Sequence, residues 1–436
     1  MLETVKNKED ILKKLNIEKL NPMQEEASKA ISSFDEVILL SPTGTGKTLA
    51  FLLPIIDELD EKCTEIQCLI LVPTRELAIQ IESVIREMGS GFKVNAVYGG
   101  RSGSKEKTEL KHRPAILIGT PGRVSDHIRR ERFSTDNITT LVLDEFDKSL
   151  EIGFKAEMED IVTGLSNIKK KILTSATKGV EIPKFIGLQN PKEIDFSDDG
   201  IPKLEINTVI SPDKDKLETL VELLFNEGGK PGIVFCNFKD SIQDVCNYLS
   251  DANIDFGTYY GGMEQQDREL TLIKFRNGTH RLIIATDVAA RGLDIPELKF
   301  IIHYELPFKE REFIHRNGRT ARMNSKGTAY ILKWKKEQLP DFIRNTKIKK
   351  LKEAPVFQAS EWETLYINGG RRDKISKGDI AGLFFKEAKL NKDELGVIEL
   401  KHDAVYVAVH KSKANFIIEK FNNTRIKKKK VRISIV

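Results

Sequence analysis

Short runs of consecutive aliphatic residues alternate with stretches of helical periodicity along most of the chain. In the first half the aliphatic runs lie at 36–40, 68–74, 115–120, 140–145 and 171–177. After a polar stretch that contains glycine and proline, at 195–205, the pattern resumes at 231–237, 282–287 and 299–305. Strands that are apolar on both faces belong to parallel sheets covered by helices on each side. The pattern therefore predicts an α/β chain with two tandem parallel-sheet domains, residues 1–198 and 199–350.

Residues 361–436 follow a different pattern. Two helical stretches separate four strand-like runs, in the order β-α-β-β-α-β: 364–369, 376–388, 395–401, 404–409, 413–423 and 431–436. A lysine-rich stretch near 345–362 precedes them and marks a second boundary. We therefore expect a small α+β domain at the C-terminal end, called the C-terminal domain (361–436) below.

Composition and charge narrow the class of protein. The chain has 436 residues, of which 40% are hydrophobic and 31% charged, as in folded globular proteins. Lysine and arginine outnumber aspartate and glutamate by only 70 to 65 in the whole chain, but by 17 to 10 in 361–436. The basic excess thus lies entirely in the C-terminal domain. This asymmetry favours an appended nucleic-acid-binding module, and a merely solubilising segment is the alternative.

Several features point to a cytoplasmic protein. No apolar run is long enough for a transmembrane helix, and the N-terminal residues lack the apolar core of a signal peptide. Cys63, Cys68, Cys236 and Cys246 fit no common zinc spacing, so we expect reduced thiols. We predict no membrane partner and a monomer.

The stretch SPTGTGKT (41–48) follows the first aliphatic run and precedes a helical pattern. Gly44 and Gly46 let backbone N–H groups approach phosphate oxygens, and the start of the following helix favours an anion. Lys47 would reach the β- and γ-phosphates, and the Thr48 hydroxyl would bind Mg²⁺. Ser41 replaces the glycine expected six positions before Lys47, where only a compact residue is required.

The run 140–143 ends in the acidic quartet DEFD, called the acid box (144–147). Asp144 is placed to hold the same Mg²⁺ as Thr48. Glu145, pointing to the opposite face of the strand, is placed to orient or deprotonate the attacking water. A solvated turn is the alternative for the quartet alone, but the phosphate loop favours a nucleotide site.

Together these motifs resemble those of the DEAD-box RNA helicases of helicase superfamily 2, over roughly residues 15–340. Beyond the phosphate loop and the acid box, the matching stretches are PTREL (73–77), Gly99–Gly100, TPGR (120–123), SAT (175–177), GIVFCN (232–237), QQDR (265–268), TDVAARGLDIP (286–296) and HRNGRTAR (315–322). The resemblance implies two RecA-like domains that bind ATP and Mg²⁺ and act on RNA.

The resemblance also implies roles for individual residues. It places ATP on Gln24, Thr43, Gly44, Thr45, Gly46, Lys47, Thr48 and Asp294, with Mg²⁺ held largely through water by Thr48 and Asp144. It assigns catalysis to Lys47, Asp144, Glu145, Arg319 and Arg322, the last two as arginine fingers. It assigns coupling between the ATP and RNA sites to Asp147, Ser175, Thr177 and His315. It assigns RNA contacts to Pro73, Thr74, Arg75, Gly99, Gly100, Thr120, Pro121, Gly122, Arg123, Gln265, Arg268, Thr286, Asp287 and Arg291.

Two positions depart from the family pattern. Phe146 stands where alanine is usual in the acid box, and we expect it to fill apolar space beneath the sheet. Ile17 replaces the aromatic residue that normally precedes the adenine-reading Gln24, so adenine stacking is expected to be weaker.

The C-terminal domain has the element order of an RNA-recognition motif. LYINGG (365–370) loosely resembles the first aromatic motif, with Tyr366 placed to stack on a base, but the second motif offers only Tyr406. The stretch is more similar to the atypical domain of the DbpA/YxiN helicases, which recognise a large-subunit ribosomal RNA hairpin. Its expected basic surface comprises Arg371, Arg372, Lys374 and RIKKKK (425–430).

The sequence thus predicts an ATP-dependent RNA helicase that separates RNA strands locally by closure of its two RecA-like domains. Ribosomal RNA and pre-ribosomal particles are the expected partners, and ribosome assembly is the expected process. Three alternatives stay open: an ATP-gated RNA clamp that seldom unwinds, a DNA-directed superfamily 2 translocase, and an RNA-binding scaffold with an inactive nucleotide fold.

Overall fold

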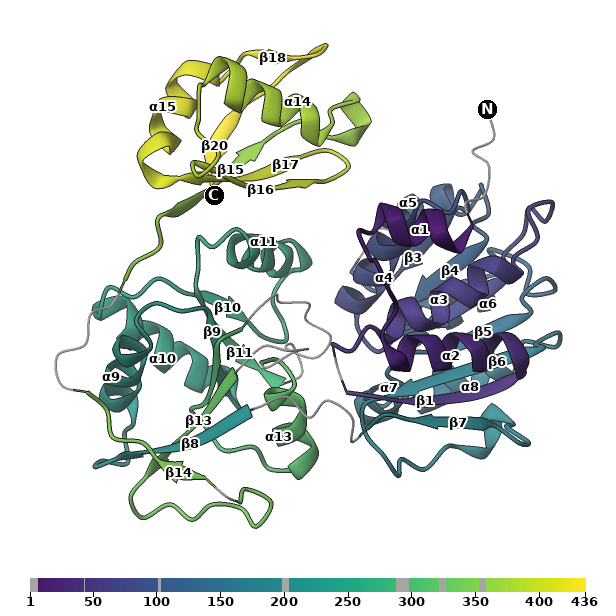
Figure 1. The fold of residues 1–436 in the computed structure, drawn as a ribbon, viewed down its shortest axis with the longest axis horizontal. Helices are drawn as coiled ribbons and strands as arrows, with labels where there is room; N and C mark the ends of the chain where they lie inside the picture. The colour runs from purple at the N-terminus through teal and green to yellow at the C-terminus, as the bar shows by residue number, and fades with distance from the viewer. Residues whose placement is uncertain are drawn as a thin grey trace. The chain divides into compact units, whose positions relative to one another are not determined.

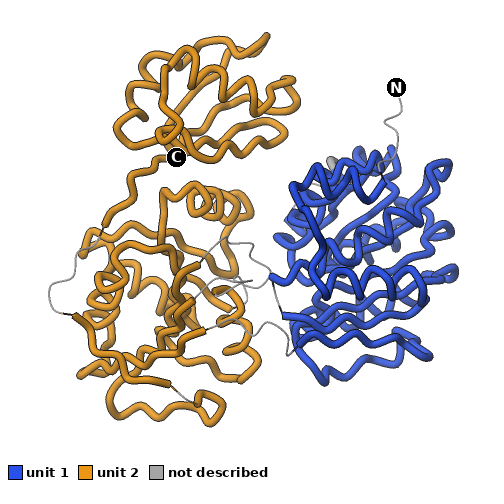
Figure 2. Tube along the Cα trace, in the orientation of Figure 1, with its two compact units in different colours: residues 1–202, 291–294 blue, residues 203–290, 295–436 orange. Residues whose placement is uncertain are grey.

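The computed structural model describes residues 7–42, 44–100, 103–197, 204–287, 298–320, 327–344, 346–352 and 358–436. The chain forms two compact units, the first with residues 1–202 and the second with residues 203–290 and 295–436 (Figure 2). The predicted second and third domains therefore fall in one unit. Among the described residues, no helix is long and apolar enough to cross a bilayer.

The first unit contains a seven-stranded sheet in which every paired strand runs parallel to its neighbour (Figure 1). In spatial order its strands are β3 (Val94–Val97), β4 (Ile116–Gly119), β2 (Cys68–Leu71), β5 (Thr140–Leu143), β6 (Lys170–Ser175), β1 (Glu36–Leu40) and β7 (Lys192–Asp195). The aliphatic runs of the sequence form β1, β2, β4, β5 and β6, as predicted. The short strand β3 and the edge strand β7 were not predicted.

Helices cover both faces of this sheet. They are α1 (Lys8–Lys14), α2 (Pro22–Ser33), α3 (Lys47–Glu58), α4 (Arg75–Met88), α5 (Gly103–Glu109), α6 (Pro121–Arg129), α7 (Phe146–Ile152) and α8 (Lys155–Thr163). Side chains of β1 alternate between the two faces of the sheet. Val37 and Leu39 belong to the apolar cluster formed with α1–α4, whereas Ile38 and Leu40 belong to the cluster on the opposite face, formed with α6, α7 and α8. Phe146 is buried in the cluster that contains Ile38 and Leu40, so it fills apolar space beneath the sheet as expected.

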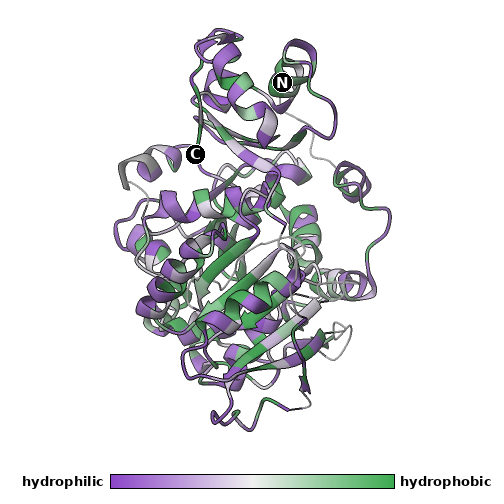
Figure 3. Ribbon diagram, turned by 90° about the vertical axis from the view of Figure 1, so that its left-hand side faces the viewer, coloured by the Kyte–Doolittle hydropathy of each residue, from purple (hydrophilic) through white to green (hydrophobic). Residues whose placement is uncertain are grey.

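The second unit repeats this architecture with another parallel seven-stranded sheet. Its order is β10 (Gly257–Tyr259), β11 (Leu282–Thr286), β9 (Gly232–Cys236), β12 (Phe300–His303), β13 (Gly327–Trp334), β8 (Leu204–Ser211) and β14 (Lys347–Ile348). The helices are α9 (Leu217–Glu227), α10 (Lys239–Asp251), α11 (Gln265–Arg276) and α13 (Glu310–Asn317). In the hydropathy colouring, strands in the middle of the view are green, the hydrophobic end of the scale (Figure 3).

The C-terminal domain has a four-stranded antiparallel sheet and the predicted β-α-β-β-α-β order. Its elements are β15 (Trp362–Ile367), α14 (Lys377–Gly382) continued by a π-helical turn (Leu383–Glu387), β16 (Leu395–Leu400), β17 (Val405–His410), α15 (Lys411–Phe421) and β20 (Ile433–Ile435). A small hairpin of β18 (Arg425–Ile426) and β19 (Lys429–Lys430) was not predicted. It contains most of the basic run.

The four cysteines, Cys63, Cys68, Cys236 and Cys246, all lie in the described residues, and none of them is in a disulfide. Burial raises the pKa of the Cys68 thiol far above its usual value. The same cause raises the pKa of Cys246 to about 11.

Candidate nucleotide and RNA sites

The phosphate loop connects β1 to α3 in the first unit. Gly44 and Gly46 have φ values of 87° and 88°, which a residue with a side chain rarely adopts. Lys47 turns its ammonium group back into the loop and donates hydrogen bonds to the carbonyl oxygens of Ser41 (2.6 Å) and Pro42 (2.9 Å). The loop therefore carries a buried cation where phosphates are expected, and Thr43 lies outside the described residues.

Burial lowers the pKa of Lys47 to about 8, while the nearby carboxylates of Glu145 and Asp144 act in the opposite direction. A buried ammonium group that lacks a full negative counterpart is poorly stabilised. An anionic ligand would remove this deficit, so the electrostatics of the loop favour a phosphate.

Gln24, expected to read adenine, also supports the loop. Its Nε2 donates to the carbonyl of Gly46 at 3.2 Å, and its Oε1 accepts from the backbone N–H of Asn21. Asn21 in turn donates from Nδ2 to the carbonyl of Thr45 at 3.0 Å. A Cβ at Gly46 would lie 2.4 Å from Gln24 Nε2, so this close approach requires glycine. Sequence reasoning did not foresee the contribution of Asn21.

The acid box begins where β5 ends. Burial, and then the neighbouring Glu145, raise the pKa of Asp144 to about 6. Glu145 has φ +49° and ψ +48°, a left-handed conformation that turns the chain into α7. The fully buried Lys148 places its Nζ 2.7 Å from Glu145 Oε1. Lys148 was not among the predicted site residues, although it directly follows the acid box.

The expected coupling residues of the first unit, Asp147, Ser175 and Thr177, do not all interact with one another. Ser175 Oγ donates to the carbonyl of Thr177 and accepts from its N–H, both at 2.9 Å, so this turn closes on itself. Asp147 is almost fully buried, and neither carboxylate oxygen accepts a hydrogen bond from the described residues. The expected link between Asp147 and Ser175 or Thr177 is therefore not formed here.

The expected RNA residues of the first unit lie at the starts of α4 and α6, except Gly99 and Gly100, which lie in a turn after β3. Thr74 caps α4, and the Arg75 guanidinium lies against the backbone of Gly99 and Gly100. A Cβ at Gly100 would stand 2.6 Å from this guanidinium. Because Gly99 and Gly100 lack side chains, the guanidinium of Arg75, from the PTREL stretch (73–77), can lie against their backbone.

Arg123 is held by a residue that sequence reasoning missed. Its Nε donates to Glu106 Oε2 at 2.7 Å, and Glu106 also contacts His127 Nε2 (2.9 Å) and the N–H of Tyr98 (3.3 Å). The carboxyl side chain of Glu106 is fully buried. A buried acid at this place fixes the start of α6, where Thr120, Pro121 and Gly122 lie.

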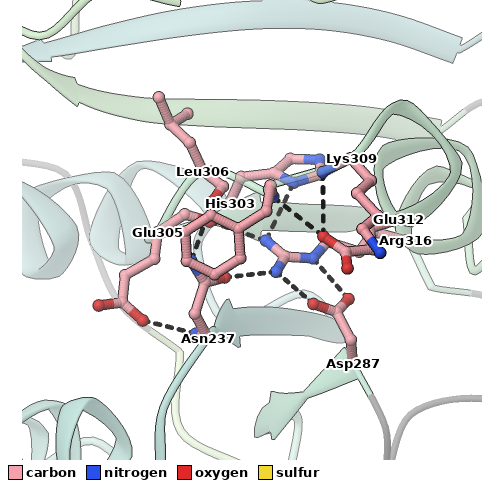
Figure 4. Close-up of polar contacts among 9 residues, drawn as sticks. Asn237, Asp287, His303, Glu305, Leu306, Lys309, Glu312 and Arg316 are labelled. Carbon is pink, nitrogen blue, oxygen red and sulfur yellow. Dashed lines mark hydrogen bonds and ion pairs between the residues drawn. The ribbon is translucent and has the colours of Figure 1, made fainter. Parts of the chain in front are cut away.

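In the second unit, Arg316 connects three of the predicted motifs (Figure 4). Its guanidinium donates to both carboxylate oxygens of Asp287 (2.7 and 2.5 Å), to Asn237 Oδ1 (2.7 Å) and to the carbonyl of Glu305 (2.7 Å). Asp287, expected to contact RNA, thus has both oxygens engaged by a buried arginine. Arg316 was not predicted as a site residue, although it lies within HRNGRTAR.

The other predicted residues of this unit that the structure describes lie on α11, at the end of β11 and around the end of α13. Gln265 begins α11, Arg268 lies over the Tyr259 ring at 4.8 Å, and Thr286 ends β11. His315 and Arg319 are buried, with Arg319 Nε donating to the His315 carbonyl. Arg291, Asp294 and Arg322 lie outside the described residues.

The face of the C-terminal sheet that is not covered by its own helices contacts the segment that follows α11. Thr364 Oγ1 is hydrogen-bonded to Thr279 Oγ1 (2.7 Å) and accepts from Asn277 Nδ2 (3.2 Å). Beside them, Arg276 donates to both carboxylate oxygens of Glu399. Part of the sheet face that an RNA-recognition motif offers to bases is therefore covered by protein.

Tyr366 and Tyr406 lie on this same face with ring centroids 5.5 Å apart. The predicted basic surface lies elsewhere: Arg371, Arg372 and Lys374 are exposed beside the turn that precedes α14. Lys427 of the hairpin forms an ion pair with Asp379 at 2.8 Å, which fixes the hairpin beside α14.

Comparison with known proteins agrees with this arrangement. Residues 21–184 match the DEAD/DEAH box helicase family, 215–324 the helicase conserved C-terminal domain and 364–435 the DbpA RNA binding domain. The chain is 31% identical over 435 residues to the ATP-dependent RNA helicase DbpA of Bacillus subtilis, covering 92% of this chain and 91% of that protein. It is 33% identical over 431 residues to DbpA of Escherichia coli, covering 96% and 94%.

Solved structures show the same similarity in the helicase core. Saccharomyces cerevisiae Dbp5 bound to RNA and ADP BeF3 aligns with a TM-score of 0.67 and 26% sequence identity. The alignment covers 75% of this chain and 87% of the Dbp5 chain.

Proposed function

Because this chain belongs to the DEAD-box ATP-dependent RNA helicases of the DbpA type, we propose that it remodels large-subunit ribosomal RNA during ribosome assembly in the cytoplasm. It is an RNA-dependent ATPase, and RNA is its partner. The observation that carries the proposal is the pairing of a helicase core with a C-terminal domain of the DbpA type.

The residues of the phosphate loop fit ATP with Mg²⁺. A buried Lys47 and the left-handed Gly44 and Gly46 favour phosphate oxygens, and a hydroxyl and a carboxylate are suitable Mg²⁺ ligands at Thr48 and Asp144. When bound, the metal–nucleotide complex supplies the phosphoanhydride that is hydrolysed. We assign adenine recognition to Gln24, whose amide can both donate and accept.

Glu145 is the group that we propose orients water and accepts its proton. Arg319 and Arg322 supply positive charge for the transferring phosphoryl group, because a guanidinium stays charged and spans several oxygens. These arginines belong to the second unit and Glu145 to the first. Catalysis would therefore require closure of the two RecA-like domains. ATP binding would favour this closure and, with it, RNA binding.

RNA would bind through phosphates and 2′-hydroxyls, because the candidate residues are arginines, hydroxyls and helix starts. Arg75 and Arg123 serve in the first unit and Arg268 in the second. Asp287 acts indirectly, since its carboxylate is bound by Arg316. Closure would bend one strand and release its partner locally.

The C-terminal domain would select the RNA. Its sheet face is partly covered by Asn277 and Thr279, so the exposed Arg371, Arg372 and Lys374 are better placed for RNA phosphates. Contacts between this domain and the segment after α11 would fix the selected RNA relative to the second RecA-like domain. We propose that the protein acts as a monomer.

The test is ATPase stimulation by a panel of RNAs of equal length. The panel contains a hairpin from the peptidyl-transferase region of large-subunit ribosomal RNA, unrelated RNA and single-stranded DNA. We expect preference for the ribosomal hairpin, loss of this preference after deletion of 361–436, and no stimulation by DNA. Equal stimulation by all RNAs would contradict the ribosomal assignment, and ATP turnover without release of a labelled strand would favour an RNA clamp.

A further inference from the structure

The chain turns sharply between β5 and α7, at the two acids that are assigned to metal and water. Glu145 adopts φ +49°, a conformation that is strained for a residue with a side chain. Such a conformation persists only where neighbouring groups hold it. The neighbours of Asp144 and Glu145 therefore matter for where the two carboxylates point.

One hydroxyl contacts both acids. Thr174 Oγ1 donates to Asp144 Oδ1 and accepts from the backbone N–H of Glu145 at 3.1 Å. Thr174 is fully buried on β6, which is paired with β5 so that Leu173 lies beside Leu143. The next residues along the two strands, Thr174 and Asp144, are consequently neighbours.

We propose that Thr174 is a positioning residue for the nucleotide site, fixing the Asp144 carboxylate and the Glu145 backbone with a single hydroxyl. This inference rests on the proposed function of those two acids. The hydroxyl occupies one Asp144 oxygen, which orients the other. Its second hydrogen bond holds the backbone N–H of Glu145, the residue in the strained left-handed conformation.

Replacement by valine keeps the shape and removes the hydroxyl. Thr174→Val leaves a buried carboxylate oxygen of Asp144 and the N–H of Glu145 without their partner. Thr174→Ser is the matched control, because it keeps the hydroxyl and loses only a methyl group. A structural role in packing predicts the opposite order, with serine more damaging than valine.

The primary readout is binding of a fluorescent ADP analogue to the full chain as a function of Mg²⁺. We expect affinity in EDTA to be unchanged in Thr174→Val, because Lys47 and the loop are intact. The Mg²⁺ concentration needed to tighten binding should rise by roughly tenfold, as is typical when a group supporting a metal ligand is lost. Thr174→Ser should follow the wild type, and RNA-stimulated kcat should fall in Thr174→Val but not in Thr174→Ser.

Wild-type Mg²⁺ dependence and kcat in Thr174→Val would overturn the inference. If that variant fails to fold, Thr174→Ala tested in the same titration decides in its place. A wild-type protein whose ADP binding ignores Mg²⁺ would instead contradict the assignment of Thr48 and Asp144. The two failures are thus distinguishable.

Discussion

Two buried cationic side chains, Lys47 in the first unit and Arg316 in the second, are held by different kinds of contact. In the first unit, Lys47 donates to carbonyl oxygens of its own loop, and Ser175 bonds within its own turn. In the second unit, Arg316 joins side chains and backbone from separate segments, Asn237, Asp287 and Glu305. One set of contacts is local, and the other spans the domain.

This difference indicates different roles for residues that sequence motifs treat alike. A phosphate can replace the local carbonyl partners of Lys47 without disturbing distant segments. The partners of Arg316 cannot be exchanged without leaving buried polar groups unpaired. We therefore expect changes at Lys47 to alter ligand binding and catalysis, and changes at Arg316 to alter the stability of the second unit.

The largest effect is predicted for Arg316→Met, which should destabilise the second unit by about 3–5 kcal/mol because Asp287 would remain charged and poorly compensated. Both tryptophans of the chain, Trp334 and Trp362, lie in this unit, so their fluorescence during urea denaturation reports on it. Arg344→Met, at an exposed position of the same unit, is the control. A midpoint for Arg316→Met that equals the control would remove the proposed difference between the two units.

Lys47→Ala should lower ATPase activity without lowering thermal stability. RNA-stimulated ATP turnover should fall by on the order of 100-fold, because a charge aimed at the phosphates is lost. Burial lowers the pKa of Lys47 to about 8, so the side chain is still mostly charged at neutral pH, but keeping this charge in the folded protein costs free energy. We therefore expect no decrease in melting temperature by circular dichroism, and a marked decrease would show that Lys47 is as structural as Arg316.

The sequence was sufficient to predict the architecture. Aliphatic runs gave the central strands, because strands buried on both faces must be continuously apolar. The short strand β3 (Val94–Val97) and the mostly exposed β7 (Lys192–Asp195) carry no such signal and were missed. The phosphate loop was equally predictable, since few other structures require Gly44, Gly46, Lys47 and Thr48 at that spacing.

The supporting residues of the sites were not predictable in the same way. Glu106 and Thr174 act on Arg123 and Asp144 through contacts between separate segments, and neither stands in a motif that was quoted for the site. Arg316 did stand in a motif, but only the structure shows that its guanidinium binds Asp287. Pairing across strands is a tertiary property, so spacing along the chain does not reveal it.

A smaller, pH-dependent effect is predicted for His303, which lies beside Arg316. Burial, reinforced by Arg316, lowers the pKa of His303 to about 3. The unfolded chain therefore binds a proton below the ordinary histidine pKa when the folded chain does not, so stability falls as the pH decreases below about 6.5. His303 alone should cost about 2 kcal/mol at pH 5 relative to neutral pH.

The measurement compares urea denaturation of wild type and His303→Gln at pH 7 and pH 5, followed by tryptophan fluorescence. Glutamine is uncharged and can place a polar group near Asn317, which contacts His303 Nε2 at 3.1 Å. Other groups, such as His280, contribute equally to both proteins. Equal losses of stability on acidification would mean that His303 is not held neutral beside Arg316.

The smallest effect is predicted for the ion pair between Arg276 and Glu399, whose side chains are 30% and 19% exposed. A double-mutant cycle with Arg276→Ala and Glu399→Ala should give a coupling energy of about 1 kcal/mol, because solvent screens a pair at this depth. The charge-swapped double variant, Arg276→Glu with Glu399→Arg, should recover most of this coupling energy.

Lys401 also contacts Glu399 at 2.9 Å, so Lys401→Met serves as the control. A coupling near zero would leave attachment of the C-terminal domain to its other contacts, which include the two hydrogen bonds of Thr364 and the Lys411–Asp255 ion pair. A coupling energy as large as the loss of stability in Arg316→Met would mean that a partly exposed ion pair stabilises this protein as much as the buried Arg316 does. The degree of burial would then not explain the proposed difference.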